Sequence, residues 1–217
     1  MKRKKQSQNY IPKDSVYFVA KERGFVARSA IKLEELDKKH KLYRKGMKIL
    51  DLGCAPGSWL QYASPKIGTA GKILGIDIAP VRVDLQNVVT VLGDLTELHS
   101  DSKIFESWDN FDLFQSDAMV KTSGIPDSDC ARSLELVEHG LNLARSGKLK
   151  TGGTFIAKVF EGPGFTPFYV QFKRLFAKAS VNKPDSIRQG SREIYIVGQG
   201  FRPQVLELAN TKRESQD

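Results

Sequence analysis

The chain alternates between residue patterns typical of strands and patterns typical of helices, and this alternation restricts the folds that it can adopt. Strands are expected at residues 47–51, 72–77, 88–92, 111–115, 154–160 and 193–197. Helices are expected at 26–40, from a glycine-rich turn at 53–57 to residue 67, at 131–144 and at 167–177. Strands separated by helices predict an α/β fold, in which a mostly parallel sheet is covered by helices on both faces.

The size and composition indicate one globular domain. The chain has 217 residues, of which 40% are hydrophobic, which is enough for a substantial core and excludes a disordered, collagen-like or repeat protein. We expect a domain at 14–205, between a basic, flexible arm at 1–13 and a polar tail at 206–217. Within the domain, 14–46 is expected to be a basic helical segment, and 47–205 the part that forms the sheet.

Several classes of protein are unlike this sequence. No apolar run approaches the roughly 20 residues that span a bilayer, and no apolar stretch follows the charged N-terminus as in a secretory signal. Cys54 and Cys130 are too far apart for a CxxC motif, and the three histidines lack metal-ligand spacing. We therefore expect a cytoplasmic protein without a membrane anchor, a metal site or a disulfide framework.

Positive charge is concentrated in the first quarter of the chain. Residues 1–50 hold 15 Lys and Arg against 5 Asp and Glu, whereas the rest hold 19 against 20. A segregated basic segment that also carries aromatic rings is typical of a surface that binds RNA phosphates and bases. A solubilising surface is the alternative, above all for the short run at 2–5. The candidate RNA-binding residues are Arg23, Arg28, Lys38 and Lys41.

Carboxylates and a glycine turn follow successive predicted strands, where ligands bind in parallel α/β sheets. The turn that begins with Asp51 and Gly53 matches neither the GxGxxG fingerprint nor a P-loop, so a diphosphate is not expected there. Asp77 follows Asp51 by 26 residues, where a carboxylate can accept both hydroxyls of an adenosine ribose. Asp94, after the next strand, could accept the exocyclic amine of an adenine. Ribose and adenine without a phosphate cradle predict S-adenosylmethionine as cofactor.

Four further charged residues stand out from their surroundings. Lys158 interrupts an apolar strand, Glu193 opens the last strand, Lys32 lies between Ile31 and Leu33, and Asp117 closes the fourth strand. Each alone is compatible with a solvated surface charge, but together they can converge at one edge of the sheet.

The residues that carry these charges resemble the FtsJ/RrmJ family of RNA ribose 2′-O-methyltransferases. The resemblance runs from about Asp14 to Pro203, and the motifs that carry it are Arg28–Leu33, Asp51–Trp59, Ser116-Asp117, Lys158–Gly162, Lys183–Ser186 and Ser191–Val197. It implies a Rossmann-like class I methyltransferase fold with a seven-stranded sheet.

The resemblance also implies roles for individual residues. It makes Lys32, Asp117, Lys158 and Glu193 a catalytic tetrad in which Lys158 is the general base. It implies contacts to S-adenosylmethionine from Gly57, Trp59, Asp77, Asp94 and Asp117. Residues Ala118–Lys121 depart from the family, which usually has Met-Ala-Pro-Asn after the tetrad aspartate, so the acceptor pocket is less well defined than the chemistry.

The sequence thus predicts a monomeric enzyme that methylates a ribose 2′-hydroxyl of RNA with S-adenosylmethionine. The compact chain is most similar to the bacterial members that methylate a uridine of large-subunit ribosomal RNA, either as naked RNA or as an assembled subunit. A tRNA 2′-O-methyltransferase of the same family and a catalytically silent RNA-binding or ribosome-assembly factor are the alternatives. A small-molecule methyltransferase would leave the basic N-terminal segment unexplained.

Overall fold

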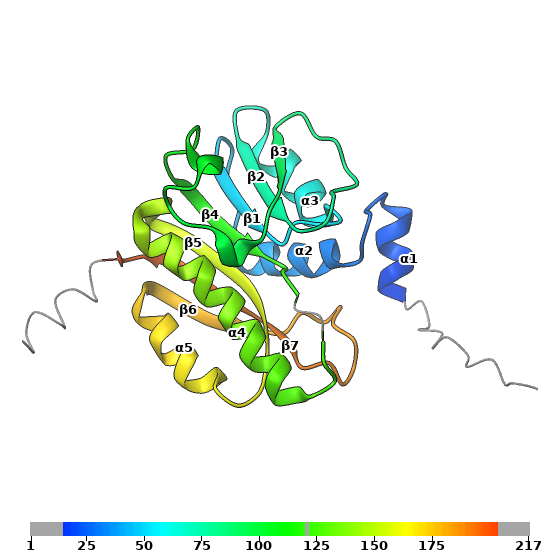
Figure 1. The fold of residues 1–217 in the computed structure, drawn as a ribbon. Helices are drawn as coiled ribbons and strands as arrows, with labels where there is room; N and C mark the ends of the chain where they lie inside the picture. Colours follow the sequence, from blue (N-terminus) through cyan, green and yellow to red (C-terminus); the bar gives the residue numbers. More distant parts are fainter. Residues whose placement is uncertain (1–14, 120–121, 204–217) are drawn as a thin grey trace, which may run out of the picture.

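The computed structural model describes residues 15–119 and 122–203 (Figure 1). The predicted arm at 1–13 and the predicted tail at 206–217 lie outside the described residues. Within the two described ranges, no helix combines the length and the apolar character needed to cross a membrane.

One seven-stranded sheet runs through the molecule in the order β3-β2-β1-β4-β5-β7-β6. Its strands are β1 Lys48–Leu52, β2 Lys72–Asp77, β3 Val88–Leu92, β4 Phe111–Ser116, β5 Leu149–Phe160, β6 Phe176–Asn182 and β7 Glu193–Phe201. The strands from β3 to β5 pair in parallel, whereas β7 is antiparallel to both of its neighbours, β5 and β6. The prediction of a mostly parallel, seven-stranded α/β sheet is confirmed.

Helices cover both faces of this sheet (Figure 1). Helices α2 Ser29–His40 and α3 Ser58–Ile67 pack on one face, where their apolar side chains join those of β1, β2, β4, β5 and β7. Helices α4 Pro126–Leu143 and α5 Phe165–Arg174 pack on the other face. Helix α1 Ser15–Glu22 lies beside the start of α2, and short helical turns occur at Leu95–Glu97, Lys103–Phe105 and Ala144–Lys148.

The two layers of helix explain why the central strands are apolar on both sides. In β1, residues 49–52 are all buried, and so is nearly every residue of β5 from Phe155 to Val159. On the α4–α5 face, the rings of Phe114, Phe155 and Phe172 follow one another at centroid separations of 6.0 and 6.1 Å. Burial of each such side chain stabilises the fold by about 1.5–3 kcal/mol.

The helix expected at 167–177 was partly wrong. Helix α5 ends at Arg174, and strand β6 begins at Phe176. Phe172, Leu175 and Phe176 follow the i, i+3, i+4 spacing of a helix, but they are buried because a strand succeeds the helix beneath the same apolar layer. Since β6 is the last strand of the sheet and pairs only with β7, its alternation is weak and does not predict a strand.

The reversed direction of β7 places its first residue beside the last residues of its parallel neighbours. Glu193 pairs with Phe160 at the carboxyl end of β5, and Ser116 at the end of β4 pairs with Ala157. The carboxyl ends of β1, β2, β4 and β5 and the amino end of β7 therefore share one edge of the sheet, called here the carboxyl edge. Asp77, Asp117, Lys158 and Glu193 come from this edge, and so does Asp94, which follows the parallel strand β3, whereas Lys32 comes from α2.

Candidate active site

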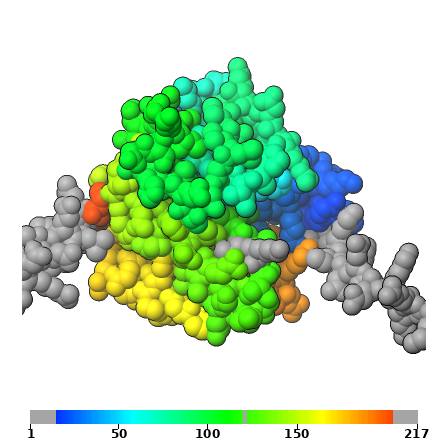
Figure 2. Space-filling model, in the orientation of Figure 1, coloured from blue at the N-terminus to red at the C-terminus, as the bar shows by residue number. Residues whose placement is uncertain are grey.

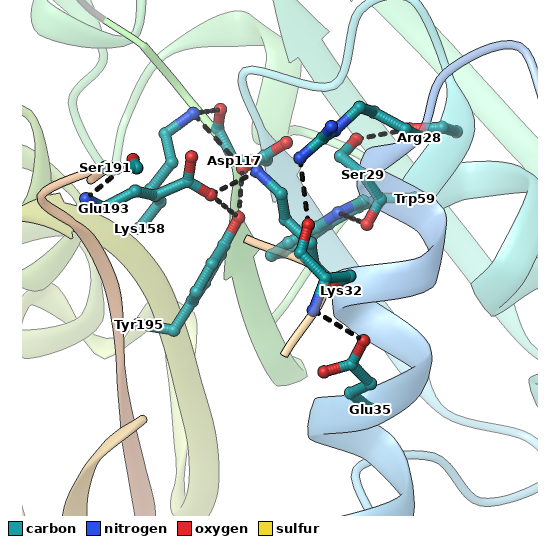
Figure 3. Close-up of polar contacts among 12 residues, drawn as sticks. Arg28, Ser29, Lys32, Glu35, Trp59, Asp117, Lys158, Ser191, Glu193 and Tyr195 are labelled. Atoms are coloured by element: carbon teal, nitrogen blue, oxygen red, sulfur yellow. Dashed lines mark hydrogen bonds and ion pairs between the residues drawn. The ribbon is translucent and has the colours of Figure 1, made fainter. Parts of the chain in front are cut away.

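The four residues of the predicted tetrad meet at the carboxyl edge (Figure 3). Lys158 on β5 donates to the backbone carbonyl of Asp117 at 2.7 Å and forms an ion pair with its carboxylate at 3.2 Å. Lys32, which α2 directs inward, forms an ion pair with Glu193 at the start of β7. Lys32 and Lys158 are only 7% and 9% exposed. The result is two lysines, each held by one carboxylate, in a largely buried and electrically balanced cluster.

Tyr195 joins the two ion pairs into one network. Its hydroxyl lies 2.6 Å from the Glu193 carboxylate and 3.0 Å from that of Asp117, so it can donate to either. Burial and these two carboxylates raise the pKa of Tyr195 well above its usual value, which keeps the hydroxyl protonated and able to donate. Tyr195 was not among the predicted site residues, although its position two residues after Glu193 puts both side chains on the same face of β7.

Helix α2 also holds the loop that precedes β7. The Glu35 carboxylate accepts the backbone N–H groups of Asp185 at 2.6 Å and Ser186 at 3.2 Å. Arg28, one turn before Lys32, donates to the carbonyl of Ser186 at 2.9 Å. Figure 3 shows Lys32 and Glu35 on α2 and Arg28 at the residue just before the helix. One helix thus supplies a tetrad lysine and also fixes the loop that leads to the tetrad glutamate.

A second cation lies close to Arg28 at this loop. Burial, and to a smaller extent the nearby charge of Arg188, lower the pKa of Arg28. In Figure 2, the N-terminal residues (blue) and the loop before β7 (orange) lie on the same side of the molecule. Arg188 was not among the predicted RNA-binding residues, because nothing in its local sequence places it beside α2.

A cleft of about 700 Å³ opens beside the tetrad at the carboxyl edge. Its lining includes the tetrad residues Lys32, Asp117, Lys158 and Glu193, together with Gly53, Asp77, Asp94 and a rim formed by residues 76–79, 93–96, 117–119, Arg132 and Leu136. Four of the predicted cofactor-binding residues, Gly53, Asp77, Asp94 and Asp117, therefore face one cavity that is contiguous with the catalytic candidates.

The carboxylates of the cleft are held by backbone groups. Asp77 accepts the N–H of Ala55 through one oxygen and the N–H of Ala79 through the other, both at 2.8 Å. It therefore joins the glycine turn after β1 to the turn after β2. Asp94 is exposed, and hydrogen bonds from the backbone and hydroxyl of Thr96 lower its pKa. Both side chains are hydrogen-bond acceptors with lone pairs to spare, as recognition of ribose hydroxyls and an adenine amine requires.

The glycine turn packs closely against neighbouring loops because two of its residues have no side chain. Gly53 has φ of 76°, and a Cβ there would lie 2.5 Å from Ala118 on the facing loop. Gly57 has φ of 111°, and a Cβ there would lie 2.6 Å from Val83. Positive φ and the lack of space both require glycine at these positions. The cleft and its donor set thus fit the adenosine part of S-adenosylmethionine.

Three other predicted cofactor residues lie outside the lining of the cleft. Gly57 caps α3, and Trp59 is buried with its indole N–H donated to the carbonyl of Ser29 at 3.1 Å. Asp51 is fully buried below the glycine turn, where it accepts the side-chain N–H of Gln115 at 2.8 Å. Direct contact of these three residues with the cofactor stays a prediction. Their positions support the turn and the helix behind it.

The burial of Asp51 has an electrostatic consequence. Burial, opposed by the Gln115 hydrogen bond and reinforced by the charges of Asp117 and Asp77, raises the pKa of Asp51 to about 8. Its second oxygen has no hydrogen-bond partner among the described residues. Gln115 in turn accepts the hydroxyl of Tyr43 at 2.7 Å, so a hydrogen-bonded row crosses from the basic segment to the glycine turn.

The four predicted RNA-binding residues do not form a single patch. Arg23 and Lys38 both pair with Glu34, at 2.6 and 3.3 Å. Lys41 is an exposed residue in the left-handed conformation that ends α2. Arg28 lies near the other end of the helix, beside the tetrad. A helix rises about 1.5 Å per residue, so Lys41 and Arg28 are on the order of 20 Å apart along α2. Their contact with RNA stays a prediction.

Comparison with known proteins identifies the family. The sequence profile of the FtsJ-like methyltransferases matches residues 25–201, which includes every residue of the tetrad. The chain belongs to the FtsJ-like methyltransferase family. The predicted family and the prediction of a methyltransferase enzyme are therefore confirmed.

Relatives of this FtsJ-like methyltransferase align over nearly their whole length. It is 44% identical over 192 residues to the ribosomal RNA large subunit methyltransferase E of Bdellovibrio bacteriovorus, covering 87% of this chain and 97% of that one. It is 43% identical over 199 residues to the protein of the same name from Desulfatibacillum aliphaticivorans, covering 91% and 95%.

Solved structures agree with this assignment. A Plasmodium falciparum protein described as a ribosomal RNA methyltransferase superimposes with a TM-score of 0.71 at 30% identity, over 82% of this chain and 98% of that one. A Methanococcus jannaschii fibrillarin, a pre-rRNA processing protein, is 16% identical with a TM-score of 0.53 over 74% and 68% of the two chains, and it shares the fold alone. The predicted Rossmann-like methyltransferase fold is confirmed.

The loop that departs from the family lies at the mouth of the cleft. Ala118 and Met119 line the cleft, and Met119 is 67% exposed. Val120 and Lys121 lie outside the described residues.

Proposed function

We propose that this FtsJ-like methyltransferase transfers a methyl group from S-adenosylmethionine to the 2′-hydroxyl of a uridine in large-subunit ribosomal RNA. The observation that carries the proposal is the pair of buried ion pairs, Lys158 with Asp117 and Lys32 with Glu193, beside a cleft suited to an adenosine. The choice of RNA is supported by the names of the relatives, which describe them as ribosomal RNA large subunit methyltransferases.

The cleft residues would hold the cofactor by its polar groups. Asp77 would accept the ribose hydroxyls and Asp94 the adenine amine, and Gly53 lines the cleft with them. When bound, S-adenosylmethionine supplies an electrophilic methyl group on a sulfonium. Among the described residues, no group of three or more His, Cys, Asp or Glu side chains is placed to hold a metal ion. The proposed proton transfer uses side chains of this chain.

Lys158 is the proposed general base. A ribose hydroxyl becomes a useful nucleophile when a base removes its proton during the attack. Lys158 lines the cleft, and its Nζ, in the neutral amine form, would receive that proton. The carbonyl and carboxylate of Asp117 fix the position of Nζ in the cleft.

The other tetrad residues would position the acceptor and balance charge. Lys32, held by Glu193, places a cation in the same cleft as Lys158. The Tyr195 hydroxyl holds both carboxylates in one arrangement. Glu193 and Lys32 line the cleft, where they could contact the ribose.

The decisive experiment identifies the methylated product. The purified protein is incubated with labelled S-adenosylmethionine and, in parallel reactions, with large-subunit ribosomal RNA, isolated large subunits and tRNA from a strain that lacks the enzyme, and each RNA is digested to nucleosides. Labelled 2′-O-methyluridine from the large-subunit RNA is the expected product. Label on a base would contradict the ribose mechanism, and label on tRNA alone would favour the tRNA alternative. Undetectable transfer to naked RNA and to isolated large subunits would favour a silent assembly factor.

A further inference from the structure

A second hollow lies at the opposite edge of the sheet, where β1, β2 and β3 begin, called here the amino edge. It has a volume of about 810 Å³. Its walls are the first residues of β1 and β2, the end of α3 with the following turn, residues 86–89 and the segment 103–108. In Figure 1 this edge lies toward the top of the molecule. Strand β2 connects the two cavities directly, because Lys72 at its start lines the amino-edge hollow and Asp77 at its end lines the cofactor cleft.

The hollow carries an excess of positive charge. Lys48, Lys72 and Lys103 line it, against the single carboxylate of Glu106. Lys48 makes one long ion pair, 3.9 Å from Asp109, a side chain that is 91% exposed. Lys72 and Lys103 are exposed, and neither side chain has an ion pair with another residue of the described part of the chain. Cations without internal partners are available to an external anion.

The hollow also has a rigid floor. The Asn87 side chain donates to the carbonyls of Ser64 and Gly68 and accepts the hydroxyl of Ser64 at 2.6 Å, which ties the end of α3 to the start of β3. Trp108 is 9% exposed and stacks on Phe111 at 5.3 Å. The lysines therefore project from a surface whose backbone is held in place.

Part of the basic N-terminal segment ends at this edge. Lys45 donates to the carbonyl of Pro65 at 3.0 Å beside the hollow, and Lys48 lies in its wall. Both belong to the first 50 residues, which carry the whole positive excess of the chain. Helix α2 starts beside the tetrad, and the chain then returns to the amino edge, where β1 begins. The basic segment therefore has positively charged residues at both edges of the sheet.

We propose that the amino-edge hollow is a second RNA-binding site, which holds phosphates of the same RNA whose ribose enters the cleft. The inference rests on the proposed function and extends it to the shape of the substrate. Five residue steps along β2, at about 3.3 Å each, separate Lys72 from Asp77 by roughly 17 Å. An RNA that contacts both sites must therefore pass around one side of the protein, and an oligonucleotide too short to do so reaches only the cleft.

Charge reversal in the hollow tests this proposal. In the variant with Lys72→Glu and Lys103→Glu, neither residue touches the cleft, so cofactor binding and transfer to a short oligouridine should remain within two-fold of wild type, as expected for phosphate contacts that only position the substrate. Affinity for transcribed large-subunit ribosomal RNA should fall roughly ten-fold or more. The slope of log affinity against log salt should flatten by about 1.4–1.8, because two phosphates are no longer neutralised.

A matched control distinguishes the loss of a local RNA contact from an effect of the changed net charge. Lys173→Glu with Lys178→Glu changes the charge equally on α5 and β6, at the far side of the sheet. The control should bind the long RNA with nearly the wild-type affinity. Equal losses in both variants, or an unchanged salt slope in the hollow variant, would overturn the proposal.

Two further results would also be decisive. If the hollow variant lost affinity only for assembled subunits and not for naked RNA, the partner at the amino edge would be a ribosomal protein, and the RNA proposal would be wrong. If the wild type bound long RNA through the hollow but transferred no methyl group to any RNA, the proposed function would fail while the second RNA site stood.

Discussion

Glu35 and Ser186 are 151 positions apart in the chain, yet the carboxylate of Glu35 accepts the backbone N–H of Ser186 at 3.2 Å. The same carboxylate accepts the N–H of Asp185, and Arg28 holds the carbonyl of Ser186. Because Ser186 precedes Glu193 in the loop before β7, the position of the tetrad glutamate depends on a residue of α2 that does not itself line the cofactor cleft.

Glu35→Ala should slow methyl transfer by roughly 10- to 100-fold, because misplacement of a reacting group by about 1 Å is enough for such a loss. Cofactor affinity, measured by calorimetry, should stay within a few-fold. Glu34→Ala is the control, since Glu34 pairs with Arg23 and Lys38 on the surface and should change transfer by less than about three-fold. A loss of cofactor binding equal to the loss of turnover would assign Glu35 to general stability instead.

Lys158→Ala should abolish transfer to RNA, because it removes the amine that is proposed to accept the hydroxyl proton. Binding of S-adenosylmethionine should remain within a few-fold of wild type. The control is Lys150→Ala. Lys150 lies on the same strand and pairs with Asp112 at the amino edge, so this variant should retain most of the activity. Single-turnover assays measure both variants. Near-normal turnover by the Lys158 variant would remove this lysine from the role of base.

Asp77→Asn should weaken S-adenosylmethionine binding by about 1.5–3 kcal/mol, the range for hydrogen bonds that involve a charged group. The substitution keeps the size of the side chain but replaces one acceptor of the backbone N–H groups of Ala55 and Ala79 with a donor. RNA affinity should barely change. Asp84→Asn, at an exposed position in the following loop, is the control. Unchanged cofactor affinity in calorimetry would place the ribose elsewhere.

Asp51 should make the stability of the protein depend on pH. Burial raises its pKa from 3.8 to about 8, so between these values the folded protein keeps a proton that the unfolded chain has released. Stability then falls as pH rises through this window, by at most about 1.4 kcal/mol per pH unit, and levels off above the folded pKa. The Asp51→Asn variant has no titratable carboxyl group at this position, so its stability lacks this pH dependence. The free energy of unfolding of the variant, measured with denaturant, should therefore improve relative to wild type from pH 5 to pH 8. Parallel curves for the two proteins would show that Asp51 stays ionised.

Lys38→Gln with Lys41→Gln should weaken RNA binding and flatten its salt dependence by about 0.7 log units for each single-strand phosphate that these lysines no longer neutralise. Both side chains are exposed at the end of α2, and Lys38 is 71% exposed even though it pairs with Glu34. Filter binding at several salt concentrations measures the slope. A slope equal to that of wild type would make this end of α2 a solubilising surface.

The strand ends were the most predictable part of the site. Asp77, Asp94, Asp117 and Gly53 follow apolar strands in the sequence, and the rule that ligands bind at the carboxyl edge is enough to bring them to one cleft. Lys158 and Glu193 could be found because each is a charge within or beside an apolar strand, where a buried charge needs a partner. The sequence pattern was therefore sufficient to predict those site residues whose position depends on a single strand.

The contacts made across long separations could not be predicted in the same way. Tyr195 resembles one more apolar residue of β7, and its role becomes visible only when Asp117 lies opposite its hydroxyl. Trp59 is close to the glycine turn in sequence, but α3 turns its ring toward the carbonyl of Ser29 and away from the cleft. Basic residues near one another in the N-terminal segment separate to opposite edges because α2 runs between them. The local sequence pattern does not show where these side chains lie relative to distant parts of the chain.

The position of β7 between β5 and β6 has a consequence for biosynthesis. The ribosome releases the chain from its N-terminus, so β5 emerges with an unpaired edge, and the strand that covers it begins only at Glu193. At about 5–20 residues per second, the roughly thirty residues between the two strands delay closure by some seconds. Until then Lys32 and Lys158 have emerged but Glu193 has not, so a nascent chain cannot assemble the tetrad. The ion pair between Lys32 and Glu193 can form only after Glu193 has left the ribosome.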